Sequence, residues 1–348
     1  MRRRLISLLL LFALSAAAMA AQSGPRGVLL ALAKNDRTLS VVDPATLHVL
    51  ARYPSGPDPH EVIASSDGKL AFISNYGFGQ YRTISVIDLA SHKTLPPIDL
   101  GVLSGPHGLF FAGGKLYFTA EVNKVIGRYD PTARKIDWLL GTGQNRTHMI
   151  FVSPGLDRIY TSNVSSGTVS LIEETMLRPG GPPPSPSHGA GPPPGAARPD
   201  WNETVLPAGP GSEGFDVSPD GRELWVASAG AGVITVIDLR ERKVAQTLNA
   251  DVRGANRLKF TPDGKLVFVS SLQNGNVTVM DVAARRPIKR IPVGHGAGGI
   301  LMEPGGARAF VACSPDNSIA VIDLKTLAVV GRIDVGKNPD GLAWAVSR

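Results

Sequence analysis

Residues 211–248 read GSEGFDVSPDGRELWVASAGAGVITVIDLRERKVAQTL, and they decide the fold because close variants follow them twice. Residues 254–291 read GANRLKFTPDGKLVFVSSLQNGNVTVMDVAARRPIKRI, and residues 296–333 read GAGGILMEPGGARAFVACSPDNSIAVIDLKTLAVVGRI. Each copy holds four short apolar runs, rich in Val and Ile and separated by turn residues such as Asp-Gly. A repeat of roughly 40 residues made of four strands indicates a β-propeller blade.

Four further copies complete the pattern, and the earliest of them is split between the two ends of the chain. Three begin near Pro59, Pro106 and Thr147. The earliest starts at Gly27 without an opening strand, and the missing strand is found at residues 338–346. We therefore predict an all-β, seven-bladed propeller of four-stranded antiparallel blades in one domain, residues 21–348. Its C-terminal strand joins the N-terminal blade and closes the ring.

The fourth copy is interrupted by residues 176–200, which include PGGPPPSPSHGAGPPPG. Such Pro/Gly/Ser content cannot form a packed core. We expect a disordered surface insert between the third and fourth strands of this blade, with the sheet resuming at residues 201–206.

The N-terminus has the pattern of a secretory signal peptide. Three arginines precede the apolar run of residues 5–14, and Ala18-Met19-Ala20 is a small-x-small cleavage site. We expect residues 1–20 to be removed from an exported protein, periplasmic or extracellular, that keeps no membrane segment. Without those arginines, 33 Lys and Arg stand against 29 Asp and Glu, an excess too small to favour nucleic acid as the partner. The single cysteine, Cys313, excludes an intrachain disulfide, and we expect a monomer.

Three marks recur in the copies: a Ser/Thr-Pro-Asp-Gly hairpin, a second strand ending like Tyr160-Thr161-Ser162-Asn163, and a third strand like Ile234–Leu239. In these marks the chain resembles the YVTN family of β-propeller repeats, over its whole mature length except the insert. The resemblance implies the fold and an exported scaffold, and it assigns no reaction. A recurring aspartate ends the third strand in six copies, so we interpret it as a turn residue: Asp43, Asp88, Asp130, Asp238, Asp281 and Asp323.

Chemistry is expected where the copies differ, at the residue just before each first strand. Because that strand is innermost, this position forms the rim of the central channel. The predicted ligand-binding rim consists of His60, His107, His148, Glu213, Asn256 and Asp340, with Gly298 in the seventh copy. Neutral imidazoles beside a carboxylate suit Zn²⁺ or Cu²⁺. The candidate metal ligands are therefore His60, His107, His148 and Glu213. A polar rim without metal and a purely structural ring are the alternatives.

Four further side chains form a predicted secondary rim: Asn75, Glu121, Asn163 and Arg257. Asn75 and Asn163 end second strands, where they could instead cap the following hairpin. Arg257 is one residue beyond its rim position, as is Glu61 in the second copy. Adjacent strand residues point to opposite faces, so these two side chains could instead face blade interfaces.

The sequence favours a binding scaffold over an enzyme, and it does not identify the ligand. We expect a small ligand or a protein partner at the channel mouth, with a divalent metal as the possible cofactor. One alternative is a metal-assisted hydrolase or lyase, similar to propeller lactonases, that uses the His/Glu rim. A weaker alternative is binding of DNA or another polyanion. The sequence contains no Gly-x-Ser-x-Gly, Walker or Cys-x-x-Cys motif that would point elsewhere.

Overall fold

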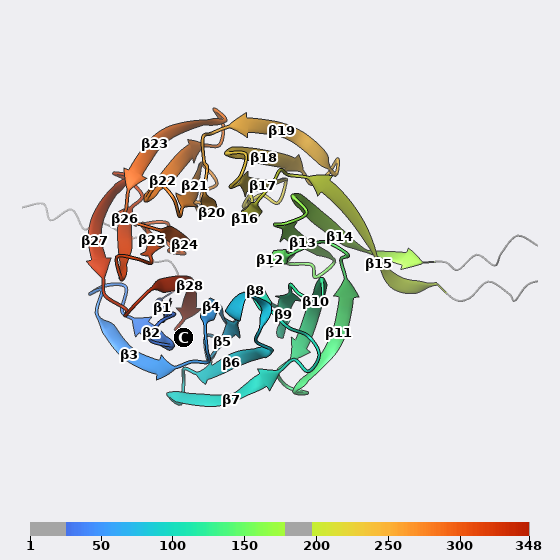
Figure 1. The fold of residues 1–348 in the computed structure, drawn as a ribbon, viewed down its shortest axis with the longest axis horizontal. Helices are drawn as coiled ribbons and strands as arrows, with labels where there is room; N and C mark the ends of the chain where they lie inside the picture. The colour runs from blue at the N-terminus through green and yellow to red at the C-terminus, as the bar shows by residue number, and fades with distance from the viewer. Residues whose placement is uncertain (1–25, 178–196, 348) are drawn as a thin grey trace, which may run out of the picture.

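The repeated apolar runs pair in order, so each repeat forms a four-stranded antiparallel sheet, and seven sheets form a ring (Figure 1). This confirms the predicted seven-bladed propeller. The computed structural model describes residues 26–177 and 197–347. In those residues no helix has the length and apolar character needed to cross a membrane. The expected signal peptide lies outside them.

We number the blades from one to seven, and each is given from the channel outward. Blade one consists of β28 (Pro339–Val346), β1 (Gly27–Ala33), β2 (Thr38–Val42) and β3 (Val49–Pro54), and blade two of β4 (Pro59–Ala64), β5 (Leu70–Asn75), β6 (Thr83–Asp88) and β7 (Lys93–Asp99). Blade three consists of β8 (Pro106–Ala112), β9 (Lys115–Ala120), β10 (Val125–Asp130) and β11 (Lys135–Gly141). Blade four consists of β12 (Thr147–Val152), β13 (Arg158–Asn163), β14 (Thr168–Leu177) and β15 (Arg198–Pro207). Blades five to seven are β16 (Ser212–Val217), β17 (Glu223–Ser228), β18 (Val233–Asp238), β19 (Lys243–Asn249); β20 (Ala255–Phe260), β21 (Leu266–Ser271), β22 (Asn276–Asp281), β23 (Arg286–Pro292); and β24 (Ala297–Met302), β25 (Arg308–Cys313), β26 (Ser318–Asp323), β27 (Ala328–Ile333). A short 3₁₀ turn, η1 (Gly77–Gly79), lies in the hairpin between β5 and β6.

Blade one is built from both ends of the chain, as predicted. Strand β28 pairs antiparallel with β1, and Ala343 lies opposite Leu30 in the register. Because β28 is the innermost strand of that blade, the ring has no open edge between its first and last repeats.

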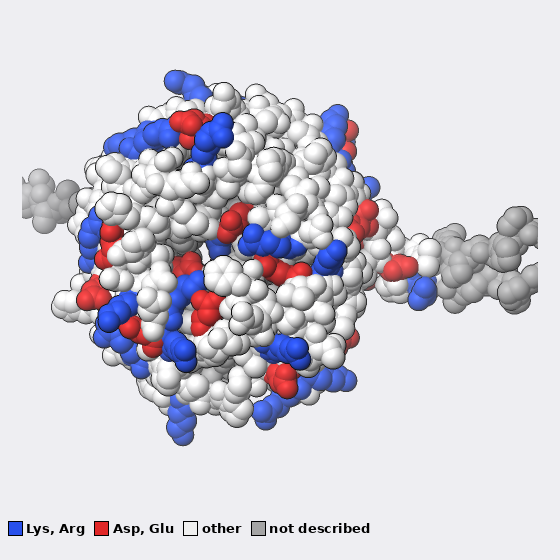
Figure 2. Space-filling view, in the orientation of Figure 1, with Lys and Arg blue, Asp and Glu red and all other residues white. Residues whose placement is uncertain are grey.

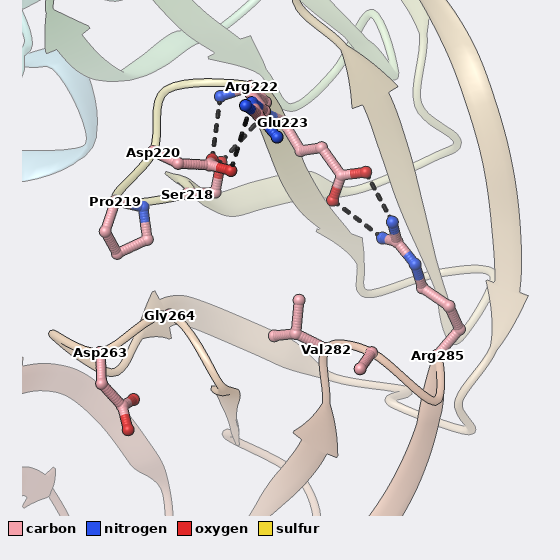
Figure 3. Close-up of a pocket in the computed structure, with 10 residues that line it drawn as sticks. Ser218, Pro219, Asp220, Arg222, Glu223, Asp263, Gly264, Val282 and Arg285 are labelled. Carbon is pink, nitrogen blue, oxygen red and sulfur yellow. Dashed lines mark hydrogen bonds and ion pairs between the residues drawn. The ribbon is translucent and has the colours of Figure 1, made fainter.

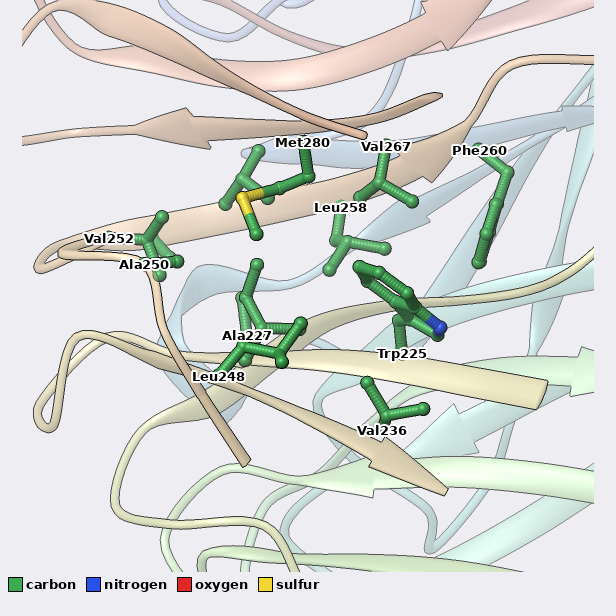
Figure 4. Packing of buried hydrophobic residues seen from close by; sticks show 13 residues of the cluster. Trp225, Ala227, Val236, Leu248, Ala250, Val252, Leu258, Phe260, Val267 and Met280 are labelled. Atoms are coloured by element: carbon green, nitrogen blue, oxygen red, sulfur yellow. The ribbon is translucent and has the colours of Figure 1, made fainter. Parts of the chain in front are cut away.

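The core consists of apolar layers between neighbouring blades. Between blades five and six, Trp225 and Val236 pack with Leu258, Val267 and Met280, all of them fully buried (Figure 4). Burying one large apolar side chain contributes roughly 1.5–3 kcal/mol to folding. Since the same packing recurs around the ring, the blades are held in fixed positions about the channel.

The hairpin that carries the insert is longer than expected. Strands β14 and β15 pair without a register shift from Thr168↔Pro207 to Leu177↔Arg198. The expected boundaries were therefore wrong at both ends, because residues 176–177 and 198–200 belong to the sheet. Strand pairing needs only the backbone, so the ladder continues beyond the packed part of the blade. Residues 178–196 of the insert lie outside the described residues.

The recurring aspartates have the turn role that their repetition predicted. Asp238 Oδ1 accepts the backbone N–H groups of Arg240 and Glu241 at 2.9 and 2.8 Å. Asp88 Oδ1 does the same for Ala90 and Ser91 at 3.0 and 2.9 Å.

Candidate functional site

In every blade the first strand is interrupted where the rim residue lies. In blade one, Asp340 and Gly341 are skipped between Pro339 and Leu342. In blade two, Pro59 pairs with Asn75 and Val62 with Ile73, so His60 and Glu61 are skipped by the register. The skipped pairs in the other five blades are His107–Gly108, His148–Met149, Glu213–Gly214, Asn256–Arg257 and Gly298–Gly299. A β-bulge of this kind disturbs the strict alternation of side chains. Rim residues and the residues after them can therefore both reach the channel.

Arg257 and Glu61 each directly follow a rim residue, and both reach the channel. They belong to blades six and two, on opposite sides of the ring, and the Arg257 guanidinium bonds the Glu61 carboxylate. Both are mostly buried, with side-chain exposures of 5% and 12%. The possibility that these two residues face blade interfaces is thus wrong, because the bulge turns them toward each other across the channel.

Glu213 lies beside this pair and accepts three hydrogen bonds on one oxygen. Its Oε1 receives Asn256 Nδ2 at 2.7 Å, Arg257 Nη1 at 3.2 Å and His148 Nε2 at 3.2 Å. Burial would raise the pKa of Glu213, but the hydrogen bond and charge of His148, together with Arg257, lower it to about 2. For Arg257, burial would lower the pKa, but the negative charges of Glu61 and Glu213 have the larger effect and raise it.

A second group of charges surrounds Lys34, which directly follows β1. Its Nζ donates to His60 Nδ1 at 2.6 Å and lies 3.2 Å from Asp340 and 3.3 Å from Asp58. Burial lowers the pKa of His60, and the neighbouring Asp340 opposes that shift only in part. The Nδ1 atom of His60 is therefore already engaged as an acceptor.

His148 lies between two carboxylates. Its Nε2 faces Glu213, and its Nδ1 forms a very short contact with Glu121 Oε1. The other oxygen of Glu121 accepts the Tyr76 hydroxyl at 2.5 Å and lies 3.6 Å from Arg146 Nε. Burial would lower the pKa of His148, but hydrogen bonds to Glu121 and Glu213 raise it.

His107 is the exception in this otherwise bonded network. Its ring packs against that of His148, with centroids 3.6 Å apart and the planes tilted by 32°, and it meets His60 and Tyr76 edge-on at 4.5 and 4.9 Å. The residue is fully buried, and neither ring nitrogen has a hydrogen-bond partner in the described part of the chain. Burial, with the nearby His148 and His60, holds its pKa well below the usual range. His107 is thus a neutral imidazole with two unused nitrogens.

One His/Glu group at the channel could hold a metal ion: donor atoms of His107, Glu121 and His148 all lie within 4.8 Å of one another. This set shares two members with the set expected from the sequence. His60 is not among them, and its Nδ1 is bonded to Lys34 instead. Glu213 is not among them either, because it bonds the far nitrogen of His148.

The remaining predicted residues divide into two groups. Asn256 and Asp340 belong to the channel network, through Glu213 and Lys34. Asn75 and Asn163 do not contact it, since their amides bond hydroxyl groups of β6 and β14 in their own blades. Figure 2 shows one face of the ring, with acidic and basic side chains side by side around its middle.

Of the members of the network that were missed or underrated, which include Asp58 and Arg146, three share one position. Lys34, Tyr76 and Glu121 each directly follow the second strand of their blade. Comparing that position between the copies would have found them, since the other copies have Val164, Ala229, Leu272 and Ser314 there.

Other hollows lie at the opposite end of the first strands, between blades. One of 430 Å³ separates the Ser218–Gly221 turn from Asp263 and Gly264 (Figure 3). Its Glu223 and Arg285 form a two-fold ion pair, with one contact of 2.9 Å and one of 2.5 Å. Because its charged groups already serve as structural partners, we place the functional site in the channel.

Fold and site together define a seven-bladed propeller with a buried, charged, histidine-containing channel. Among known proteins, no family model and no curated sequence matches this chain. Solved structures do match. One is a functionally unknown protein from Desulfotomaculum acetoxidans, at 14% identity and TM-score 0.71, covering 92% of this chain and 100% of its own.

Two others carry the name "putative 6-phosphogluconolactonase". The one from Bacteroides uniformis has 14% identity and TM-score 0.70, covering 92% of this chain and 99% of its own. The one from Bacteroides fragilis has 13% identity and TM-score 0.71, covering 95% and 99%. Identities this low establish the fold alone, and the YVTN resemblance stays a prediction.

Proposed function

We propose that this chain is an exported propeller protein that binds a small, positively charged ligand at the centre of its channel. The charge of the network around the channel carries the proposal, because five carboxylates face three cationic side chains, of which Arg146 is partly exposed. The carboxylates are Asp58, Glu61, Glu121, Glu213 and Asp340, and the cations are Lys34, Arg146 and Arg257. Five against three leaves two negative charges, and a proton on both nitrogens of His148 leaves one. Buried negative charge favours a cation as its partner.

The class of ligand includes organic cations and a divalent metal ion. Export is supported by the signal-peptide pattern of residues 1–20, and a scaffold role by the resemblance to YVTN repeats. The three predicted rim histidines add imidazole donors to the carboxylates, which suits a metal ion in particular.

The same charge argues against phosphorylated ligands, whether the substrate of a lactonase or a nucleic acid. A phosphorylated lactone, like a nucleic acid, would bring phosphate charge toward the five carboxylates. The structures that carry a lactonase name share the fold with this chain at 13–14% identity, and they assign it no substrate. Both alternatives are therefore outcomes of the test.

Thermal unfolding and calorimetric titration of untagged protein test the proposal with named probes. Zinc chloride and choline chloride are the cations, phosphate and gluconate the anions, and glucono-δ-lactone the hydrolysis substrate. We expect stabilisation by at least one cation, weakened in Glu213→Gln and unchanged in Glu303→Gln. The control removes a carboxylate that, among the described residues, bonds the Arg308 guanidinium and no member of the channel network. Stabilisation by an anion, lactone turnover, or no response to any probe would contradict the proposal.

A further inference from the structure

We infer that His107, His148 and Glu121 form a binding site for one divalent transition-metal ion, with Zn²⁺ as the ion that the ligand set suits best. This inference rests on the proposed function and specifies that the bound cation is a metal ion. It replaces the ligand set expected from the sequence, in which His60 and Glu213 stood where the structure has Glu121.

The first argument is the state of His107. A buried polar atom without a hydrogen bond costs free energy, and His107 has two such atoms in a fully buried ring. Leucine or phenylalanine would fill the space between His60, Tyr76 and His148 without that cost. An imidazole at this place is therefore explained if one nitrogen bonds a ligand.

The second argument is the chemistry of the donors. Two imidazoles and one carboxylate are typical ligands of Zn²⁺ and neighbouring transition metals, whereas Ca²⁺ and Mg²⁺ prefer oxygen ligands alone. Both imidazoles come from bulges in innermost strands, His107 from β8 and His148 from β12. Glu121 comes from the hairpin after β9, and donor atoms of all three lie within 4.8 Å of one another.

The third argument is the set of residues behind the donors. Glu213 bonds the far nitrogen of His148, and Asn256 and Arg257 hold Glu213 in place. A carboxylate behind a ligating histidine orients the ring, so that Nδ1 faces Glu121 Oε1, and the ion would take the place of the proton between these two atoms. Tyr76 and Arg146 engage Oε2 of Glu121, which leaves Oε1 on the same side as that Nδ1.

The test is metal titration of untagged protein that has first been freed of metal with a chelator. We expect each chain to bind one equivalent of Zn²⁺ in equilibrium dialysis. We also expect it to bind one equivalent of Co²⁺, with the intense visible absorption bands of a Co²⁺ ion that has few ligands. His107→Gln and Glu121→Gln should weaken binding more than about a hundredfold, and Glu213→Gln about ten- to a hundredfold. The control His295→Gln changes an exposed histidine bonded to Asp316 and should bind as the unaltered protein does.

A second variant distinguishes a metal-ligating role of His107 from a purely structural one. His107→Leu removes both unpaired nitrogens, so without metal it should unfold at the same temperature as the unaltered protein or higher, while losing the Co²⁺ bands. Several results would overturn the inference: no stoichiometric binding of Zn²⁺, Co²⁺, Ni²⁺ or Cu²⁺, an unchanged affinity in His107→Gln, or a strongly destabilised metal-free His107→Leu. If choline binds while no metal does, the proposed function stands and this inference alone fails.

Discussion

Arg257 of blade six reaches across the channel and bonds Glu61 of blade two, so one ion pair joins opposite sides of the ring. The position that holds these residues is glycine in four other blades: Gly108, Gly214, Gly299 and Gly341. The crossing therefore depends on two side chains that the repeat does not otherwise carry. It links blades that share no strand pairing, and it also fixes Glu213.

Removing only one partner of this pair should be costly. In Arg257→Met, Glu61 and Glu213 lose their shared counter-charge inside the channel, and we expect a loss of roughly 3–5 kcal/mol in the free energy of unfolding. Adding Glu61→Gln should restore part of that loss. Urea unfolding of the two single variants and the double variant measures the coupling. A single Arg257→Met variant within about 1 kcal/mol of the unaltered protein would show that the pair contributes little.

Gly108 should tolerate no side chain, because blades three and four touch there. An added Cβ would lie 2.3 Å from the His148 carbonyl oxygen and 2.9 Å from Met149 Cα. We expect Gly108→Ala to destabilise the protein by at least roughly 1–3 kcal/mol and to displace His148. Gly141→Ala is the matched control, since nothing lies within 4 Å of its added Cβ. Equal unfolding midpoints for the two variants would refute this packing.

Deletion of residues 339–348 should abolish cooperative unfolding. It removes β28 and uncovers the edge of β1, whose Leu30 and Leu32 pack with Ala343 and Ala345. The control joins Thr175 to Trp201 by a short turn, which removes the exposed end of the β14–β15 hairpin and should change stability by less than about 1 kcal/mol. Circular dichroism during heating distinguishes them. A sharp, unshifted transition in the C-terminal deletion would contradict the closed ring.

Acid should weaken the ion pair of Lys115 and Asp130 in blade three. The hydrogen bond from Lys115, followed by turn N–H groups, lowers the pKa of Asp130 from 3.8 to about 2. Because the folded pKa is the lower one, the unfolded chain binds more protons, so this contribution is full above about pH 4 and disappears toward pH 2. Lys115→Met should therefore raise the folded pKa of Asp130, measured by NMR titration. Lys69→Met, at the exposed pair with Asp67, should leave the Asp130 titration unchanged. An Asp130 pKa that stays near 2 without Lys115 would contradict the assignment.

The fold could be predicted because the same four-strand pattern repeats along the sequence. Asp-Gly turns and Val/Ile runs recur often enough to place the strands, and the split first copy predicted that β28 would pair with β1. The end of the β14–β15 hairpin was not predictable, because a backbone ladder continues regardless of the side chains it carries.

The sequence predicted where the site lies, at the channel, but not which of its side chains bond each other. Comparing the copies led to His107 and His148, but which carboxylate faces which nitrogen depends on contacts between blades. Glu121 reaches His148 from the hairpin of the preceding blade, and Lys34 engages His60 from the first blade. Repeat alignment treats each blade alone, so pairings between blades do not appear in it.

Closure of the ring by β28 also has a consequence for how the chain is made. Strand β1 obtains its partner only after the strands of all the other blades have been synthesised, because β28 follows them in the chain. A chain that stops early would keep β1 with one unpaired edge, the kind of surface that invites aggregation. Strand β28 thus makes closure of the ring depend on synthesis through residue 346, because only a chain that extends that far can complete blade one.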